Sequence, residues 1–154
     1  MDTRIKEAVK GHDLLKLIGN TPVVDVFKDK YPHSDIKLKL ESYNPGGSIK
    51  DRVAYQIIMD AEIKGLISMG DELVEATSGN TGIGIAWIGK LKGYKVTIIT
   101  SDKISNEKLA LLKFYGANVI IMPSDASLES NDTLCKRCET LCGRKRPLFL
   151  RSVL

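Results

Sequence analysis

The chain has 154 residues, of which 43% are hydrophobic and 27% are charged, and its formal net charge is +4. This length suits one domain, which would bury about 70% of the surface of the unfolded chain. The composition is typical of a soluble globular protein. No apolar run approaches the roughly 20 residues that cross a bilayer, and the charged residues 1–10 contain no signal-peptide core. We therefore expect a cytoplasmic protein with no membrane partner.

The positive charge is concentrated at one end of the chain. Residues 135–154 hold six of the 23 basic residues and one of the 19 acidic residues, so the other 134 residues have 17 basic and 18 acidic side chains. A basic tail of this kind can contact nucleic acid or anionic lipid. It has no interleaved aromatic residues and no nucleic-acid-binding module, so nucleic acid is not the expected partner.

The three cysteines, Cys135, Cys138 and Cys142, also lie in this tail, at a spacing that places them along one side of a helix. A structural zinc site usually has four ligands, and His12 and His33 are remote in sequence. Small thiols on a helix in a reducing compartment are the simpler interpretation. We predict no metal.

Strand and helix patterns alternate along most of the chain. Residues 3–10 have weak helical character, and Gly19 and Pro22 indicate a turn. Strands are expected at 23–27, 36–41, 72–76, 94–100, 118–122 and 148–154, and the second of these alternates as a half-exposed strand should. Helices are expected at 48–64, 79–91, 104–115 and 130–142. This order predicts an α/β fold of three layers, a parallel sheet with helices on both faces.

The stretch Asn-Pro-Gly-Gly-Ser-Ile-Lys-Asp-Arg at 44–52 places a lysine in an unusual position. Ser48 can cap the following helix, with Asp51 completing an S-x-x-D capping box. Lys50 then lies in the first helical turn, where the helix dipole disfavours a cation. A free amine there could condense with an aldehyde. The alternative is an ordinary surface lysine whose ammonium group lies in water.

A second polar stretch, Thr-Ser-Gly-Asn-Thr-Gly at 77–82, follows an expected strand and opens an expected helix. Backbone N–H groups at such a helix start bind carboxylates and phosphates. Open α/β sheets also bind ligands at the carboxyl ends of their strands. The stretch therefore indicates an anion-binding turn, and a simple capped turn is the alternative.

These stretches resemble the motifs of one family. Residues 44–52 resemble the cofactor-lysine motif of the cysteine synthases and cystathionine β-synthases, which are fold-type II enzymes related to the tryptophan synthase β subunit and use pyridoxal 5′-phosphate (PLP). Residues 77–81 are similar to the substrate loop of this family at every position, and residues 18–22 resemble its N-terminal Ile-Gly-Asn-Thr-Pro segment. The resemblance covers residues 12–125 and weakens after residue 127.

The resemblance implies a site and a reaction. Lys50 would bond covalently to PLP and, once released, would take the α-proton of the substrate. Asn80 would also hydrogen-bond the phenolic oxygen of PLP. The substrate carboxylate would be bound by the five residues of the loop, Thr77, Ser78, Gly79, Asn80 and Thr81.

The implied reaction is β-replacement on O-acetylserine by sulfide, which gives cysteine and acetate. A cystathionine β-synthase-like reaction of serine with homocysteine is the alternative, because both enzymes share the two motifs. The family also suggests a homodimer, and serine acetyltransferase as a partner.

The family implies parts that this sequence does not contain. Its enzymes are longer and hold the PLP phosphate in a second glycine-rich loop, whereas Gly143 is the only glycine after Gly116. We expect residues 1–45 to lead in from the large domain, 46–147 to form the small α/β domain, and 148–154 to begin a truncated second domain. Most of the large domain would then be missing. A fragment, a frameshift product, a split gene and a short paralogue remain open.

The missing parts leave a function of another class open. Without the phosphate loop, the chain could be a non-catalytic homologue that acts as a binding or dimerisation module. In the family, the strands expected at 23–27 and 36–41 pair within the large-domain sheet. Here we expect them to be exposed edges that are prone to aggregation.

Overall fold

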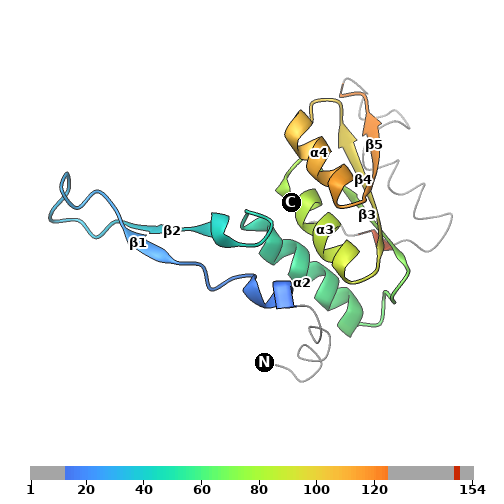
Figure 1. The fold of residues 1–154 in the computed structure, drawn as a ribbon, viewed down its shortest axis with the longest axis horizontal. Coiled ribbons are helices and arrows are strands. Elements are labelled where there is room, and N and C mark those ends of the chain that lie inside the picture. The colour runs from blue at the N-terminus through green and yellow to red at the C-terminus, as the bar shows by residue number, and fades with distance from the viewer. Residues whose placement is uncertain (1–12, 125–147, 150–154) are drawn as a thin grey trace.

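The computed structural model describes residues 13–124 and 148–149, which form an α/β body with a two-stranded arm (Figure 1). In this part of the chain, four strands form a parallel sheet in the order β5-β4-β3-β6. Their bounds are Glu72–Ala76 for β3, Lys95–Ser101 for β4, Asn118–Met122 for β5 and Leu148–Phe149 for β6. The expected α/β fold with a parallel sheet is confirmed.

The side chains of the sheet divide between two apolar clusters, one on each face. Leu73 and Ile98 belong to the larger cluster, which they form with the helices. Val74, Ile99 and Met122 form the smaller cluster, and they are between 0 and 8% exposed. Both faces are therefore buried, which explains why the central strands are almost continuously apolar.

Three helices cover the face of the larger cluster: α2 at Lys50–Ile63, α3 at Asn80–Leu91 and α4 at Asn106–Phe114. Figure 1 shows α3 between α2 and α4, on one side of the strands. Every residue of α3 from 81 to 89 is buried, because the helix packs against α2, α4 and the strands β3 and β4. The helix expected at 130–142 lies outside the described residues.

A glycine sets the distance between α2 and α3. A Cβ atom built at Gly84 would lie 2.9 Å from the Ala54 Cβ and 3.2 Å from the Lys50 carbonyl oxygen. Any larger residue would push the two helices apart where they begin. The ends of α2 and α4 follow the expected pattern, since Gly65 and Gly116 have φ of +65° and +77° at the C-terminal caps.

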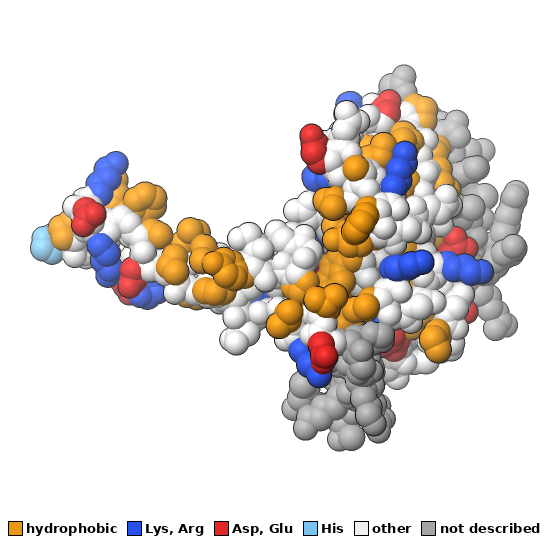
Figure 2. Space-filling view, viewed as in Figure 1, with side chains coloured by type: hydrophobic (Ala, Val, Ile, Leu, Met, Phe, Trp, Pro, Cys, Tyr) orange, Lys and Arg blue, Asp and Glu red, His pale blue; other side chains and the backbone are white. Residues whose placement is uncertain are grey.

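The arm is an antiparallel hairpin of β1, Val23–Asp25, and β2, Lys37–Lys39, with Val24 opposite Leu38. It is connected to the body through the 3₁₀ turns Asp13–Leu17 and Glu41–Tyr43. Strands are present at both expected places but are shorter than expected, and all their residues are exposed, so the half-exposed alternation expected at 36–41 is not found in Lys37–Lys39. Figure 2 shows the apolar side chains along the arm. The exposed ones include Val23, Phe27 and Leu38, which are 50 to 64% exposed.

The short strand β6 pairs in parallel with β3, with Leu148 opposite Leu73 and Phe149 opposite Val74. We expected residues 148–154 to begin a second domain, whereas this pairing makes Leu148–Phe149 the fourth strand of the small-domain sheet. We therefore propose that the small domain continues through Phe149. The rest of the division, with 1–45 belonging to a large domain, stays a prediction.

Several sequence-based expectations lie outside the described residues: the helix at 3–10, the basic tail, and the helical stripe of Cys135, Cys138 and Cys142. Within residues 13–124, no helix is both long and apolar enough to cross a membrane.

Replacing Gly84 by Ala tests the helix contact. Although Ala favours a helix over Gly by about 1 kcal/mol, its methyl group would overlap Ala54, and such overpacking costs about 1–3 kcal/mol. We expect Gly84→Ala to lower the free energy of unfolding, measured by urea denaturation. Gln56→Ala, at an exposed position of α2, should stay within about 0.5 kcal/mol of the wild type. Equal stability of the two variants would contradict a tight α2–α3 contact.

Candidate functional site

The two predicted motifs meet where α2 and α3 begin. The Asn80 side-chain amide donates a hydrogen bond to the Ser48 hydroxyl over 3.2 Å. Asn80 is the first residue of α3, and Ser48 lies just before α2. This contact links the lysine stretch directly to the Thr-Ser-Gly-Asn-Thr turn, although they are far apart in sequence.

Lys50 is the first residue of α2, so it lies in the first helical turn as the sequence predicts, and it is exposed. The capping box is wrong, however. The Ser48 hydroxyl accepts a hydrogen bond from the Lys50 N–H over 3.2 Å, and Asp51 makes no return bond to the helix start. The Asp51 side chain instead turns into the protein, where it accepts hydrogen bonds from two other donors.

These donors are the Gly46 backbone N–H, 2.5 Å from Asp51 Oδ2, and the Trp87 indole N–H, 3.1 Å from Oδ1. Asp51 is only 1% exposed. Its burial raises the pKa of its carboxyl group, and the two hydrogen bonds act in the opposite direction. A Cβ atom at Gly46 would lie 2.4 Å from Asp51 Oδ1, so this turn requires glycine.

A second polar network holds the lysine stretch from the side of the arm. The Arg52 guanidinium binds Glu41 through two hydrogen bonds, from Nε to Oε2 over 2.9 Å and from Nη2 to Oε1 over 3.0 Å. Thr21 and Asn44 also donate to Glu41, over 2.7 and 2.9 Å. These bonds lower the pKa of Glu41 from its ordinary value of 4.5 to about 2, and those from Arg52 contribute most. Because Asn44 also accepts from the Gly19 N–H over 2.8 Å, the network reaches the Ile-Gly-Asn-Thr-Pro segment.

The turn before α3 lies at the carboxyl end of β3. The Thr77 N–H donates to the Ile99 carbonyl over 2.9 Å, and the Thr77 hydroxyl accepts from the Gly79 N–H over 3.1 Å. Ser78 and Asn80 are exposed, whereas Thr81 is buried. The N–H groups of Asn80 and Thr81 lie in the first turn of α3, where the helix offers them no acceptor. The turn can therefore bind an anion with main-chain donors and with the Ser78 and Asn80 side chains.

The geometry fits part of PLP chemistry. An exposed primary amine lies at the start of α2, beside a helix start suited to a carboxylate, and both helix dipoles are positive at that point. Glycine residues on both sides let a ligand approach the main chain. The residue that could bond to an aldehyde and the donors for an amino-acid carboxylate thus lie at two helix starts that the Ser48–Asn80 hydrogen bond connects.

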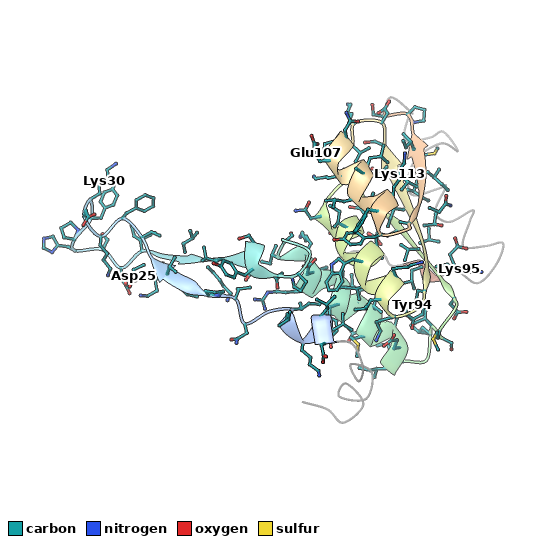
Figure 3. All side chains as sticks on the ribbon, in the orientation of Figure 1. Asp25, Lys30, Tyr94, Lys95, Glu107 and Lys113 are labelled. Atoms are coloured by element: carbon teal, nitrogen blue, oxygen red, sulfur yellow. The ribbon has the colours of Figure 1, made fainter. Side chains whose placement is uncertain are left out.

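Away from the two helix starts, the described residues form a hollow but no metal site. A hollow of about 320 Å³ lies at the amino ends of the strands, lined by residues that include Glu72, Lys95 and Asn118. Figure 3 places Tyr94 and Lys95, two of its lining residues, beyond the C-terminal end of α3. Within residues 13–124, no group of His, Cys, Asp and Glu side chains is arranged to hold a metal ion.

Comparison with known proteins decides the family. A family model described as "Pyridoxal-phosphate dependent enzyme" matches residues 14–151, most of the chain. The chain belongs to this family. The resemblance found in the sequence is confirmed, and PLP is the cofactor of the family.

The relatives of this PLP-family chain include both enzymes expected from the motifs. It is 43% identical over 134 residues to cystathionine β-synthase from Saccharomyces cerevisiae, covering 83% of this chain and 26% of the relative. It is 44% identical over 117 residues to cysteine synthase B from Escherichia coli, covering 75% of this chain and 39% of the relative.

A crystal structure of O-ureido-L-serine synthase superposes with a TM-score of 0.81 and 35% identity, over 90% of this chain and 43% of that one. The matched part of this chain thus corresponds to 26 to 43% of the length of these relatives. The match supports the family and the fold of the described body.

The network around Glu41 predicts a pH effect. Because the pKa of Glu41 is lowered on folding, its contribution to stability is present above pH 4.5 and is lost as the pH falls toward 2. We expect Glu41→Gln to reduce the free energy of unfolding at pH 7, with the difference from wild type disappearing near pH 2. Urea denaturation at several pH values measures it.

The matched control is Asp29→Asn, which changes an exposed carboxylate in the loop of the arm. This variant should follow the wild type at every pH. A Glu41→Gln variant with the pH profile of the wild type would show that the network does not contribute to stability.

Proposed function

We propose that this chain carries the cofactor lysine and the substrate turn of a PLP-dependent β-replacement enzyme of the cysteine synthase type. Lys50 would bond to PLP, and residues 77–81 would bind the α-carboxylate of O-acetylserine. Sulfide would be the second substrate, and cysteine and acetate the products. The observation that carries this proposal is the Ser48–Asn80 hydrogen bond, which brings the starts of α2 and α3 together.

Each residue of the site has a separate task. When bound, PLP supplies a conjugated ring that accepts the electrons of the substrate Cα–H bond. Lys50, once free, acts as the base that takes the proton from Cα. The first-turn N–H groups of Asn80 and Thr81 bind and orient the carboxylate. Ser48 holds Asn80 through the observed hydrogen bond, and Asn80 would also contact PLP.

The cystathionine β-synthase reaction remains the alternative within this chemistry. Both reactions replace a group on the β-carbon of an amino acid, so both need the same lysine and the same carboxylate turn. The similar identities to the two relatives, 43 and 44%, do not separate them.

A second candidate function has a specific observation in its favour. The arm exposes apolar side chains, including Val23, Phe27 and Leu38, and both of its faces lie open. Such a surface suits a binding or dimerisation module. The homodimer and the contact with serine acetyltransferase that the family suggests stay predictions.

A spectral titration with PLP tests the proposed function. Wild-type protein should develop the visible absorbance band of lysine-bound PLP, and Lys50→Ala should not, because it lacks the reacting amine. The matched control is Lys113→Ala, which removes an exposed lysine of α4 and should keep the band. A band of equal size in Lys50→Ala would contradict the role of Lys50.

Adding O-acetylserine then separates an enzyme from a protein that only binds the cofactor. A spectral change followed by cysteine formation with sulfide supports the cysteine synthase reaction. A spectral change with serine followed by cystathionine formation with homocysteine, without a reaction of O-acetylserine, supports the alternative. A spectrum that changes with neither O-acetylserine nor serine favours the binding module.

A further inference from the structure

Asp51 is a buried carboxylate to which the proposed reaction assigns no task. It follows Lys50 directly and is 1% exposed. Among the described residues it forms no ion pair, because its neighbour Arg52 binds Glu41 instead. Its hydrogen-bond partners in this part of the chain are the Gly46 N–H and the Trp87 indole N–H, both neutral donors. Burying a carboxylate without a cation is costly, so its donors have to be held in place.

The carboxylate joins three segments at one point. Asp51 lies in the first turn of α2, Gly46 lies in the turn that leads to Lys50, and Trp87 lies in the middle of α3. Each oxygen takes one donor, so the two bonds connect the lysine turn to α3. Packing leaves little space around them, since a Cβ atom at Gly46 would lie 2.7 Å from the Trp87 indole nitrogen.

We propose that Asp51 is a positioning residue, which uses Trp87 as its anchor to fix Lys50 beside the turn at residues 77–81. The Gly46 bond fixes the turn before Lys50, and the Trp87 bond fixes α2 against the helix that begins at Asn80. Lys50 lies between these two attachments. The catalytic importance of this arrangement rests on the proposed function, but the positioning of Lys50 can be measured without catalysis.

Trp87 is the anchor because of its indole N–H. Its neighbours Ala86 and Ile88 have apolar side chains, whereas the indole is large enough to reach Asp51 while remaining only 7% exposed. Trp87 is also the only tryptophan in the sequence. Its fluorescence therefore reports on this contact without interference from another indole.

The decisive variant is Trp87→Phe, which keeps an aromatic ring and removes the N–H group. Asp51 Oδ1 is then left without its donor, and the attachment of α2 to α3 loosens at Lys50. The control is Ile85→Val, which removes one methylene group from a fully buried position of α3 and also lowers stability. If Trp87 had only a structural role, Trp87→Phe and Ile85→Val would change the reactivity of the Lys50 amine to the same extent.

The readout is the reactivity of the Lys50 amine toward acetic anhydride. Peptide mass spectrometry gives the acetylation rate of Lys50 relative to Lys113, in the folded protein and in urea. We expect Trp87→Phe to shift this ratio at least about threefold toward the value of the unfolded chain, because a hydrogen bond to a charged group is lost. Ile85→Val should keep the wild-type ratio.

An unchanged ratio in Trp87→Phe, together with a loss of stability like that of Ile85→Val, would overturn the proposal. Asp51→Asn gives a second test. The NH₂ group of the new amide would face either the Gly46 N–H or the Trp87 indole N–H, so one of the two hydrogen bonds would be lost. This substitution should change the emission spectrum of Trp87, and unchanged emission in a folded Asp51→Asn variant would also contradict the contact. Neither readout uses PLP, so failure of the positioning and failure of the proposed function remain distinguishable.

Discussion

The close packing of α2 against α3 at their N-terminal ends is the constraint on which the site depends. Gly84 allows this packing, since a side chain there would overlap Ala54 and the Lys50 carbonyl. Because the helices touch where they begin, two positive helix ends lie together, and Asn80 reaches Ser48. Lys50 and a turn suited to an anion therefore lie at two helix starts in contact, which is the arrangement that the proposed function uses.

Two polar networks of different character hold the lysine stretch in this place. On one side, the bidentate contact of Arg52 with Glu41 involves two opposite charges, and Thr21 and Asn44 complete it. On the other side, Asp51 is buried and is balanced by neutral donors alone. The first network is built on the charge pair of Arg52 and Glu41, whereas the second depends on close packing, because there is no room for a side chain at position 46. Together they explain why residues on both sides of Lys50 belong to the motif.

The sequence predicts the body of the fold well where local signals are strong. The strands at 72–76 and 118–122 have the expected bounds, and Gly65 and Gly116 end their helices with positive φ, as a C-terminal cap requires. The capping box at Ser48 fails because a partner 36 residues away, Trp87, takes the Asp51 side chain. Glu41 was missed for a similar reason. In the sequence it is the last residue of the strand expected at 36–41, and only the folded chain brings Arg52 and Thr21 to it.

The most direct test identifies the lysine whose amine bonds to the PLP aldehyde. The full chain would be incubated with PLP, reduced with borohydride and digested, and the labelled peptide would be identified by mass spectrometry. The label should lie on Lys50, and an excess of a free amino-acid substrate should reduce the labelling. A label distributed over the exposed lysines, or located on one of the others, would contradict the proposed role of Lys50.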